Sequence, residues 1–387
     1  MFYGQNMKEL RILFGMSRKE LAEKLNVSQQ AIGQYENGDI QPALDKIIQM
    51  GNLFKVESSF FIKRSFIESD TPKANIAYRA PDRSSRRNIN EGAMMVRFAE
   101  SLIDIGENYF EMGRPLINDV KEKIKQMQIA NTILNEYHIE DYANVARKMF
   151  ELNDNSNLLH KLEESGVYVI ERKMMSESAD AFSVWTRTNG TLKSPFMVLG
   201  TENKSAVRRI FDIAHELGHL LLHDSIDFED LTMNEFRDYE KQANKFASAF
   251  LLPKAFVEDY LSDIDNKSIP DNYISAKEKY YVSLATAEYR AYDLGMITPS
   301  ENKNFFRNRY RKKYTIREPL DDKLIIKKPG RFLALLTAIQ QQNLISLKEF
   351  LSQLRITPQF LSIATGISKT LIDDILENEN KFSFKIR

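Results

Sequence analysis

Two histidines and a glutamate lie at the spacing of a metal-dependent hydrolase, within the segment FDIAHELGHLLLH at residues 211–223. His215 and His219 are four residues apart, so on a helix they share one face and can bind one tetrahedral zinc ion. Glu216 follows the first histidine, where it can act as general base on a water molecule activated by zinc. The motif alone leaves an alternative open, in which the two histidines only form hydrogen bonds within a buried helix.

A catalytic zinc site takes three protein ligands and keeps one coordination position open. Glu240 is the preferred third ligand, because it shares a helical face with apolar residues of the segment 238–252, which Pro253 ends. An acid on an apolar face needs a partner, and a zinc ion is one. The alternative acidic ligands are Asp224, Asp227, Glu229, Asp230, Glu235 and Asp238.

The residues around these ligands are given other roles. His223 lies about 12 Å along a helix axis from His215, too far to bind the same ion. It is expected to orient a ligand, to contact substrate or to be a polar residue near the helix end. On the second helix, Asp238 lines up with Gln242 and Lys245, a face that is expected to be solvated.

Two linked signatures, IFDIAHELGHLLLH and YEKQANKFASAFLLP, resemble those of the ImmA/IrrE-type metallopeptidases over roughly residues 155–260. The resemblance implies a zincin-like fold in which His215, His219 and Glu240 hold Zn²⁺ and Glu216 is the base, as in a gluzincin-like zinc metalloendopeptidase. Asn244, within the second signature, is a further candidate for orienting a ligand or contacting substrate. The family implies cleavage of a helix-turn-helix repressor, which releases genes from repression.

Composition indicates an ordinary soluble chain. Its 387 residues suggest two or three domains, with 43% hydrophobic and 28% charged residues. The absence of cysteine excludes disulfides and thiolate ligands, and neither an apolar run of about 18 residues nor a signal peptide is present. We therefore expect a cytoplasmic protein without a membrane segment. The net charge of zero means that any DNA-binding surface must be local.

Residues 7–62 carry a pattern typical of DNA-binding domains. Ser17, with Glu20 three residues on, predicts a capped helix, and Ser28 predicts a second helix that ends near Gly38. Two short helices joined by a tight turn at residues 26–27 form a helix-turn-helix. The segment resembles the XRE-type domain of phage repressors, a five-helix domain assigned here to residues 1–65.

The exposed face of the second helix predicts contacts to an operator. Glutamine can bind adenine through two hydrogen bonds in the major groove, so Gln29, Gln30 and Gln34 are candidate base contacts. Arg18, Lys19 and Asn37 are candidate phosphate contacts, which position a protein without reading sequence. The alternative is a helix-turn-helix that contacts only protein.

The other segments predict supporting elements. Residues 63–92 are punctuated by prolines and arginines and are interpreted as a linker, followed by helices up to about residue 152 that pack on the peptidase or form a homodimer. Three strands, VYVIERKM, AFSVWTRT and SPFMVLG, with a turn at Asn189-Gly190, predict a small antiparallel sheet whose edge strand could hold an extended substrate.

The C-terminal third carries two further patterns. Residues 302–328 mix cations with aromatic residues, which suits either a charged linker or a nucleic-acid surface. The segment ITPQFLSIATGISKTLIDDILEN aligns without gaps to MSRKELAEKLNVSQQAIGQYENG and predicts a second helix-turn-helix fold. Asp373 and Asp374 lie where DNA would be, so this module is expected to contact protein or to be degenerate.

The sequence predicts a mainly α protein with a small antiparallel β-sheet. The predicted domains are a helix-turn-helix domain (1–65), a linker and helical connector (66–154), the metallopeptidase domain (155–300) and a basic segment with a C-terminal helical module (301–387). The expected function is a regulator of mobile-element, stress or toxin–antitoxin genes. The alternative is a non-catalytic regulator or antitoxin that uses the peptidase fold as a sensor or dimerisation scaffold.

Overall fold

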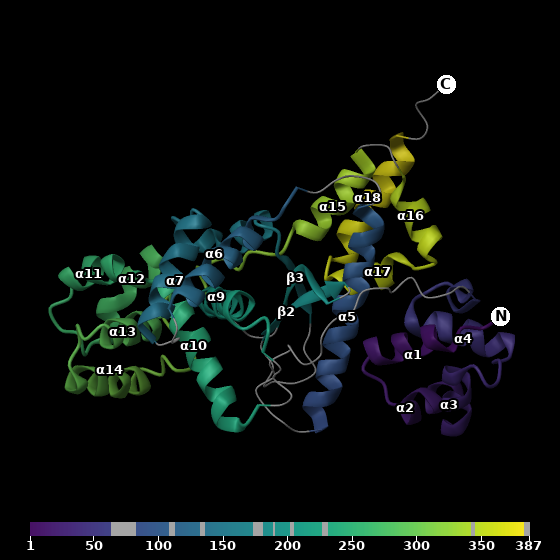
Figure 1. Ribbon diagram of the computed structural model, residues 1–387, viewed down its shortest axis with the longest axis horizontal. Coiled ribbons are helices and arrows are strands. Elements are labelled where there is room, and N and C mark those ends of the chain that lie inside the picture. Colours follow the sequence, from purple (N-terminus) through teal and green to yellow (C-terminus); the bar gives the residue numbers. More distant parts are fainter. Residues whose placement is uncertain are drawn as a thin grey trace. The chain divides into compact units, whose positions relative to one another are not determined.

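The computed structural model shows a mostly helical protein with a small three-stranded sheet, which confirms the predicted fold class (Figure 1). The structure describes residues 1–62, 83–107, 113–131, 136–172, 181–188, 190–201, 205–226, 231–341 and 345–382. The chain forms two compact units: unit 1 is Met1–Gly113, Tyr168–Gly200 and Gly330–Arg387, and unit 2 is Arg114–Val167 and Thr201–Pro329. Each predicted domain is one contiguous segment, whereas each compact unit is built from two or three separate segments. The predicted domain borders therefore stay predictions.

The helix-turn-helix of unit 1 forms where the capping residues place it. Its helices are α1 (Gly4–Leu13), α2 (Arg18–Leu25), α3 (Gln29–Asn37), α4 (Leu44–Phe54) and the 3₁₀ helix η1 (Ser58–Ile62). Ser17 and Glu20 form a reciprocal capping box at the start of α2, and the Ser28 hydroxyl accepts from the Ala31 N–H at the start of α3. Asn26 between them adopts a left-handed conformation with φ of 51°. The two predicted helices and their turn are therefore confirmed.

A long helix, α5 (Arg83–Glu107), joins the elements of unit 1. It packs on α1, on the sheet and on the C-terminal helices (Figure 1). The prediction of a linker over residues 63–92 is therefore wrong from residue 83 onward, and residues 63–82 lie outside the described part. Helix α5 forms despite its weak local pattern because it buries residues such as Met95, Phe98 and Leu102 in the core of unit 1.

The sheet of unit 1 is mixed, not antiparallel as predicted. Its strands are β1 (Tyr168–Arg172), β2 (Ala181–Thr188) and β3 (Thr191–Gly200), in the order β1-β3-β2. The hairpin turn at residues 189–190 makes β2 and β3 antiparallel, as expected, although Asn189 itself lies outside the described residues. Strand β1 pairs in parallel with β3. No local turn fixes that pairing, so the sequence pattern did not reveal its direction.

Unit 2 is helical in its described part. Its helices are α6 (Leu116–Ala130), α7 (Glu136–Met149), α8 (Leu158–Glu164), α9 (Ala206–Leu222), α10 (Met233–Leu251), α11 (Lys254–Ser262), α12 (Ile274–Tyr280), α13 (Leu284–Asp293) and α14 (Pro299–Arg311), with short 3₁₀ turns at Asn155–Asn157 and Pro270–Tyr273. Helix α9 packs on α6, α8 and α10. The buried Arg147 of α7 donates to the Phe250 carbonyl at 2.8 Å, which satisfies one of the carbonyl groups left free at the C-terminal end of α10.

The basic segment at residues 302–328 is not a linker. It includes most of α14, which begins with a capping box of Thr298 and Glu301, and it buries Phe305 completely. Lys312 pairs with Asp271 at 2.7 Å, so part of its positive charge is neutralised within unit 2. The chain then returns to unit 1 as α15 (Arg331–Gln341), α16 (Leu347–Leu354), α17 (Pro358–Thr365) and α18 (Lys369–Phe382). Among the residues described, no helix has both the length and the hydropathy needed to cross a membrane.

Candidate metal centre

Helix α9 carries the first two candidate ligands in the middle of unit 2. The Ser205 hydroxyl caps it by accepting from the Arg208 N–H, and apolar residues on nearly all sides bury it. His215 and His219 lie one turn apart and are 5% and 7% exposed. Glu216, between them in sequence, is 7% exposed. The motif therefore lies on a buried helix. Burial alone is compatible with a metal site and also with two histidines that have only a structural role.

Helix α10 brings the third ligand against α9. A capping box of Thr232 and Glu235 starts it, and the predicted inward face containing Ala243 and Ala247 is buried. Gly218 permits the close approach of the two helices, since a Cβ there would lie 3.2 Å from the Phe246 ring and 3.3 Å from the Ala243 Cα. A side chain at this position would fit only if its neighbours moved by a few tenths of an ångström, so the glycine of the motif allows α9 and α10 to pack this closely.

The three predicted ligands converge. The Nε2 atoms of His215 and His219 are 3.1 Å apart, and the Glu240 carboxylate lies 3.2 Å from His219 Nε2 and 3.6 Å from His215 Nε2. All ligand atoms of this group lie within 4.8 Å of one another. Of the alternative acids, Asp224 pairs with Lys121, Glu235 caps α10 and Asp238 pairs with Lys241, whereas Asp227, Glu229 and Asp230 lie outside the described residues.

The outer nitrogens of both imidazoles have hydrogen-bond partners. The Asn244 Oδ1 lies 3.0 Å from His215 Nδ1, where it accepts the Nδ1 proton. His219 Nδ1 lies 3.1 Å from His223 Nδ1, and His223 Nε2 lies 3.2 Å from the Gln242 Oε1, which can only accept. The proton of His223 therefore sits on Nε2, and its Nδ1 accepts from His219. In both ligands this leaves the Nε2 lone pair directed at the site, the tautomer that metal binding requires.

Charge and burial favour the same protonation states. Burial and the neighbouring His219 charge lower the pKa of His223 to about 3. His223 is therefore neutral and can accept the hydrogen bond from His219. Burial raises the pKa of Glu240, but the two imidazoles that face its carboxylate, with His219 Nε2 at 3.2 Å and His215 Nε2 at 3.6 Å, outweigh burial and hold that pKa below its usual range. Glu240 is therefore an ionised carboxylate that faces two imidazoles.

This donor set fits zinc. Two imidazole nitrogens and one carboxylate oxygen are the ligands of a catalytic zinc site with an open fourth position. Buried structural histidines would not need three donor groups to converge with their lone pairs on one point. Asn244 contacts His215 and His223 contacts His219, whereas their predicted roles beside a metal stay predictions. Gln242 was expected to face solvent. It is half-buried instead and accepts a hydrogen bond from His223, which in turn accepts one from His219. The sequence signal for such an acceptor was His223, a third histidine four residues after His219.

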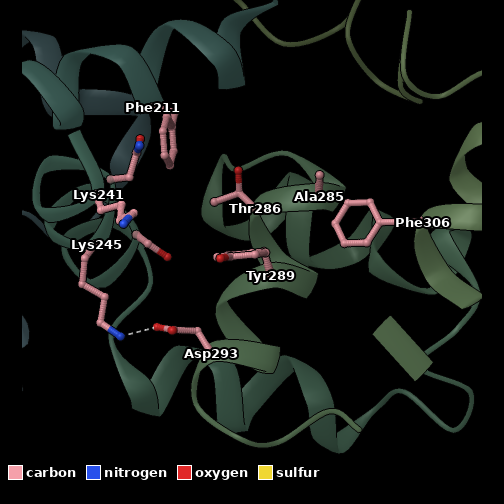
Figure 2. Close-up of a pocket in the computed structure, with 10 residues that line it drawn as sticks. Phe211, Lys241, Lys245, Ala285, Thr286, Tyr289, Asp293 and Phe306 are labelled. Atoms are coloured by element: carbon pink, nitrogen blue, oxygen red, sulfur yellow. Dashed lines mark hydrogen bonds and ion pairs between the residues drawn. The ribbon is translucent and has the colours of Figure 1, made fainter. Parts of the chain in front are cut away.

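A cavity of about 480 Å³ opens beside the metal centre. Figure 2 shows Phe211 from α9 across it from Thr286 and Tyr289 of α13, with Phe306 of α14 beyond and the Lys245–Asp293 ion pair at its side. Phe211 precedes His215 by one helical turn. Asn244 lines the cavity and also contacts His215, so the cavity and the metal centre share a wall.

The candidate DNA contacts lie along α3 and, for Arg18, at the first residue of α2. Gln29, Gln30 and Asn37 are exposed on α3, and Gln34 is half-buried. Arg18 is exposed but its Nε donates to the Glu36 carboxylate at 2.7 Å. Glu36, which sequence reasoning did not single out, is buried and also accepts from the Nε of Arg11 at 2.5 Å. Its two arginines hold α3 against α1 and α2, and they fix Arg18 beside the exposed face of α3.

Comparisons with known proteins match both parts of the chain. Residues 7–61 match the family described as Helix-turn-helix, and residues 162–292 match the IrrE N-terminal-like domain, a range that includes both the sheet and the metal centre. The HTH-type transcriptional regulator ImmR of Bacillus subtilis (strain 168) is 24% identical over 113 residues, 29% of this chain and 80% of the relative. The SPbeta prophage-derived uncharacterized HTH-type transcriptional regulator YonR, from the same strain, is 28% identical over 68 residues, 18% of this chain and 63% of the relative. The chain thus joins an XRE-type helix-turn-helix domain to an IrrE/ImmA-like domain.

Proposed function

We propose that this protein is a cytoplasmic, DNA-binding transcriptional regulator whose metallopeptidase domain is a zinc-dependent endopeptidase. Its substrate is a helix-turn-helix repressor, and cleavage releases mobile-element, stress or toxin–antitoxin genes from repression. The observation that carries the proposal is the convergence of His215, His219 and Glu240 within 4.8 Å. The names of the relatives, both HTH-type transcriptional regulators, support the regulatory half.

Each residue of the centre has a distinct task in peptide hydrolysis. When bound, zinc would polarise the scissile carbonyl and acidify the attacking water. Glu216 accepts the proton of that water and passes it to the amine that leaves. Asn244 and His223 hold the two imidazoles in the correct tautomer and orientation through their outer nitrogens. The buried helices around them exclude bulk water, which strengthens each of these interactions.

The cavity supports a peptide as the substrate. Its wall includes Phe211 and Asn244, one helical turn from His215 on α9 and from Glu240 on α10. A peptide whose carbonyl lies at the centre would therefore have a neighbouring side chain within reach of the cavity. The aromatic walls formed by Tyr289 and Phe306 favour an apolar side chain.

The decisive test replaces Glu216 with glutamine, which keeps the size of the side chain but removes its basicity. The variant should retain zinc, measured by metal analysis of the purified chain, and should no longer cleave a partner repressor. Glu240→Ala should lose zinc as well as activity. Asp238→Asn, an exposed acid on the same helix, is the matched control and should keep both.

The same experiment decides the alternative function. If Glu216→Gln leaves the regulation of target genes unchanged, then the domain serves as a sensor or dimerisation scaffold in a non-catalytic regulator or antitoxin. Zinc binding that survives Glu240→Ala would remove the proposed ligand set.

A further inference from the structure

The turn of the N-terminal helix-turn-helix recurs at other places in the chain. In the N-terminal copy, Asn26 ends α2 in a left-handed conformation with φ of 51°, and the Ser28 hydroxyl caps α3 by accepting from the N–H three residues on. The predicted C-terminal copy has the same plan. Gly366, with φ of 74°, ends α17, and the Ser368 hydroxyl accepts from the Leu371 N–H near the start of α18. The C-terminal copy is thus present in the backbone and not only in the alignment.

A further copy of the turn belongs to unit 2 and lies 255 residues after the first. Tyr281 ends α12 in a left-handed conformation with φ of 56°. The Ser283 hydroxyl then caps α13 by accepting from the Thr286 N–H at 2.9 Å. In this alignment α13 corresponds to α3, the candidate DNA-reading helix. Identical residues around the two turns are Glu23 and Glu278, Lys24 and Lys279, Val27 and Val282, and Ser28 and Ser283.

Helix α13 does not carry the side chains of a DNA reader. The three candidate base contacts of α3 are replaced by residues without an amide group, which is the group that binds adenine through two hydrogen bonds. Leu284 is completely buried, and its N–H donates to the buried Glu318 carboxylate at 3.0 Å. The N-terminal end of α13, the end that approaches bases in a DNA reader, is therefore covered within unit 2. The replacements are Leu284 for Gln29, Ala285 for Gln30 and Tyr289 for Gln34.

The corresponding face of α13 borders the cavity beside the metal centre. Ala285 and Tyr289 lie four residues apart, so they share one face of the helix, and both line the cavity. Figure 2 shows Tyr289 across the cavity from Phe211 of α9. Asn244 of α10 lines the same cavity and contacts the candidate zinc ligand His215. The face that reads bases in α3 is thus turned, in α13, to the space where a peptide substrate would lie.

Helix α13 is fixed to the helices around the metal centre. Arg290 is completely buried, and its Nε donates to the Leu252 carbonyl at the end of α10 at 3.0 Å. The same guanidinium donates to the Glu140 carboxylate of α7 at 2.6 Å. The Tyr260 hydroxyl of α11 donates to the Ala287 carbonyl at 2.6 Å. These bonds hold the α13 wall of the cavity at a set distance from the α10 wall.

The lining of the cavity favours an apolar ligand. Its charged residues are paired, Lys245 with Asp293 at 2.5 Å and Lys241 with Asp238 at 2.8 Å. The other described residues that line it contribute mainly aromatic rings, methyl groups and hydroxyls. Its volume of about 480 Å³ lies in the range of pockets that bind small ligands, so it can hold a large side chain.

We propose that α13 is the specificity helix of the IrrE/ImmA-like domain and contacts a peptide side chain instead of a DNA base. This inference rests on the proposed endopeptidase function. Ala285 leaves the space that a large apolar residue of the substrate fills, and Tyr289 supplies an aromatic wall against which that residue packs. The substrate class is therefore a peptide with leucine, methionine or phenylalanine close to the scissile bond.

Two substitutions that change the cavity in opposite directions test the proposal. Ala285→Trp fills the cavity, whereas Tyr289→Ala opens its wall, and both variants should retain zinc because neither residue is a candidate ligand. Full-length, zinc-loaded chains are given quenched fluorescent peptides that are randomised at one position at a time. At the position that the cavity accepts, the ratio of kcat/KM for leucine to that for alanine should fall at least about tenfold in Ala285→Trp. Tyr289→Ala should lower kcat/KM for phenylalanine by about two- to tenfold.

Tyr310→Ala is the matched control, because it removes a tyrosine that is 73% exposed on the neighbouring α14 and should keep the wild-type preferences. An unchanged ratio in zinc-loaded Ala285→Trp would overturn the proposal. Should that variant fail to fold, Tyr289→Ala decides, since Tyr289 is 58% exposed and its truncation leaves the core intact. An unchanged rate for phenylalanine in Tyr289→Ala would then contradict the assignment.

A binding measurement separates failure of this inference from failure of the endopeptidase function. In saturation-transfer NMR, N-acetyl-phenylalaninamide should bind the full-length wild-type chain, and its signal should be lost with Ala285→Trp. Such binding without cleavage of any peptide would refute the endopeptidase and keep α13 as a peptide-contacting helix. Equal signals from the two chains would overturn the inference even if peptides are cleaved. Weaker DNA binding by Tyr289→Ala would assign α13 to DNA and would overturn it as well.

Discussion

The hydrogen bonds to the outer nitrogens of His215 and His219 should differ in their importance for zinc binding. Partners of this kind typically contribute 10–100-fold in metal affinity, about 1.4–2.7 kcal/mol. Asn244 is exposed, so in Asn244→Leu water can replace the lost acceptor, and the loss should lie near tenfold. His223 is 2% exposed, so His223→Leu removes the observed acceptor of the His219 Nδ1 proton at a position that is shielded from water. The loss there should reach about 100-fold.

The assay is competition for zinc between the full-length chain and a chromogenic chelator, with circular dichroism as the check of folding. Asn244→Asp keeps an acceptor for His215 and should restore the affinity that Asn244→Leu loses. Lys241→Ala changes an exposed side chain on the same helix and is the matched control. An equal loss for the Asn244 and His223 variants, or no rescue by aspartate, would refute the reasoning from burial and acceptor identity.

Three further predictions address packing, pH and DNA. Gly218→Val should lower the free energy of unfolding by about 3 kcal/mol in chemical denaturation, because the side chain meets the backbone of Ala243, and zinc affinity should fall with it. Burial raises the pKa of Glu288 to about 7, so unit 2 should lose up to about 3 kcal/mol of stability as pH rises from 4.5 through 7, and Glu288→Gln should flatten this decline in thermal melts at pH 5 and pH 8. Replacing Gln29 and Gln30 with alanine should cost about 1–3 kcal/mol of base discrimination at each contacted position, and unchanged selectivity in competition binding would exclude direct readout.

The parts of the site that depend on local spacing could be predicted from the sequence. His215 and His219 follow from helical periodicity, and Glu240 follows from its place on an apolar face. Gln242 could not be placed in the same way, because its role depends on where the His223 ring points after α9 and α10 have packed. A hydrogen bond between residues on different helices leaves no periodic pattern in either segment.

The parts of the fold that depend on long-range packing were the ones that sequence patterns missed. Caps and turn residues located the helices of both helix-turn-helix modules, because those signals act within three or four residues. The start of α5 at Arg83 and the parallel pairing of β1 with β3 depend on partners far along the chain. Two buried acids of α5 are neutralised by cations of the sheet, Glu91 by Arg172 and Glu100 by Lys193. Such pairing makes a charged helix stable only once the sheet has formed.

The residues proposed for peptide hydrolysis and those proposed for reading DNA belong to different compact units of the chain. The hydrophobic cluster that joins the helix-turn-helix, α5, the sheet and the C-terminal module contains, in the described part of the chain, no residue of α9 or α10. The metal ligands, by contrast, are positioned by the packing of those two helices on each other. Glu240→Ala should therefore empty the metal centre without changing operator affinity. A change in that affinity when zinc is removed would show that the two units are energetically coupled and that metal binding itself regulates DNA recognition.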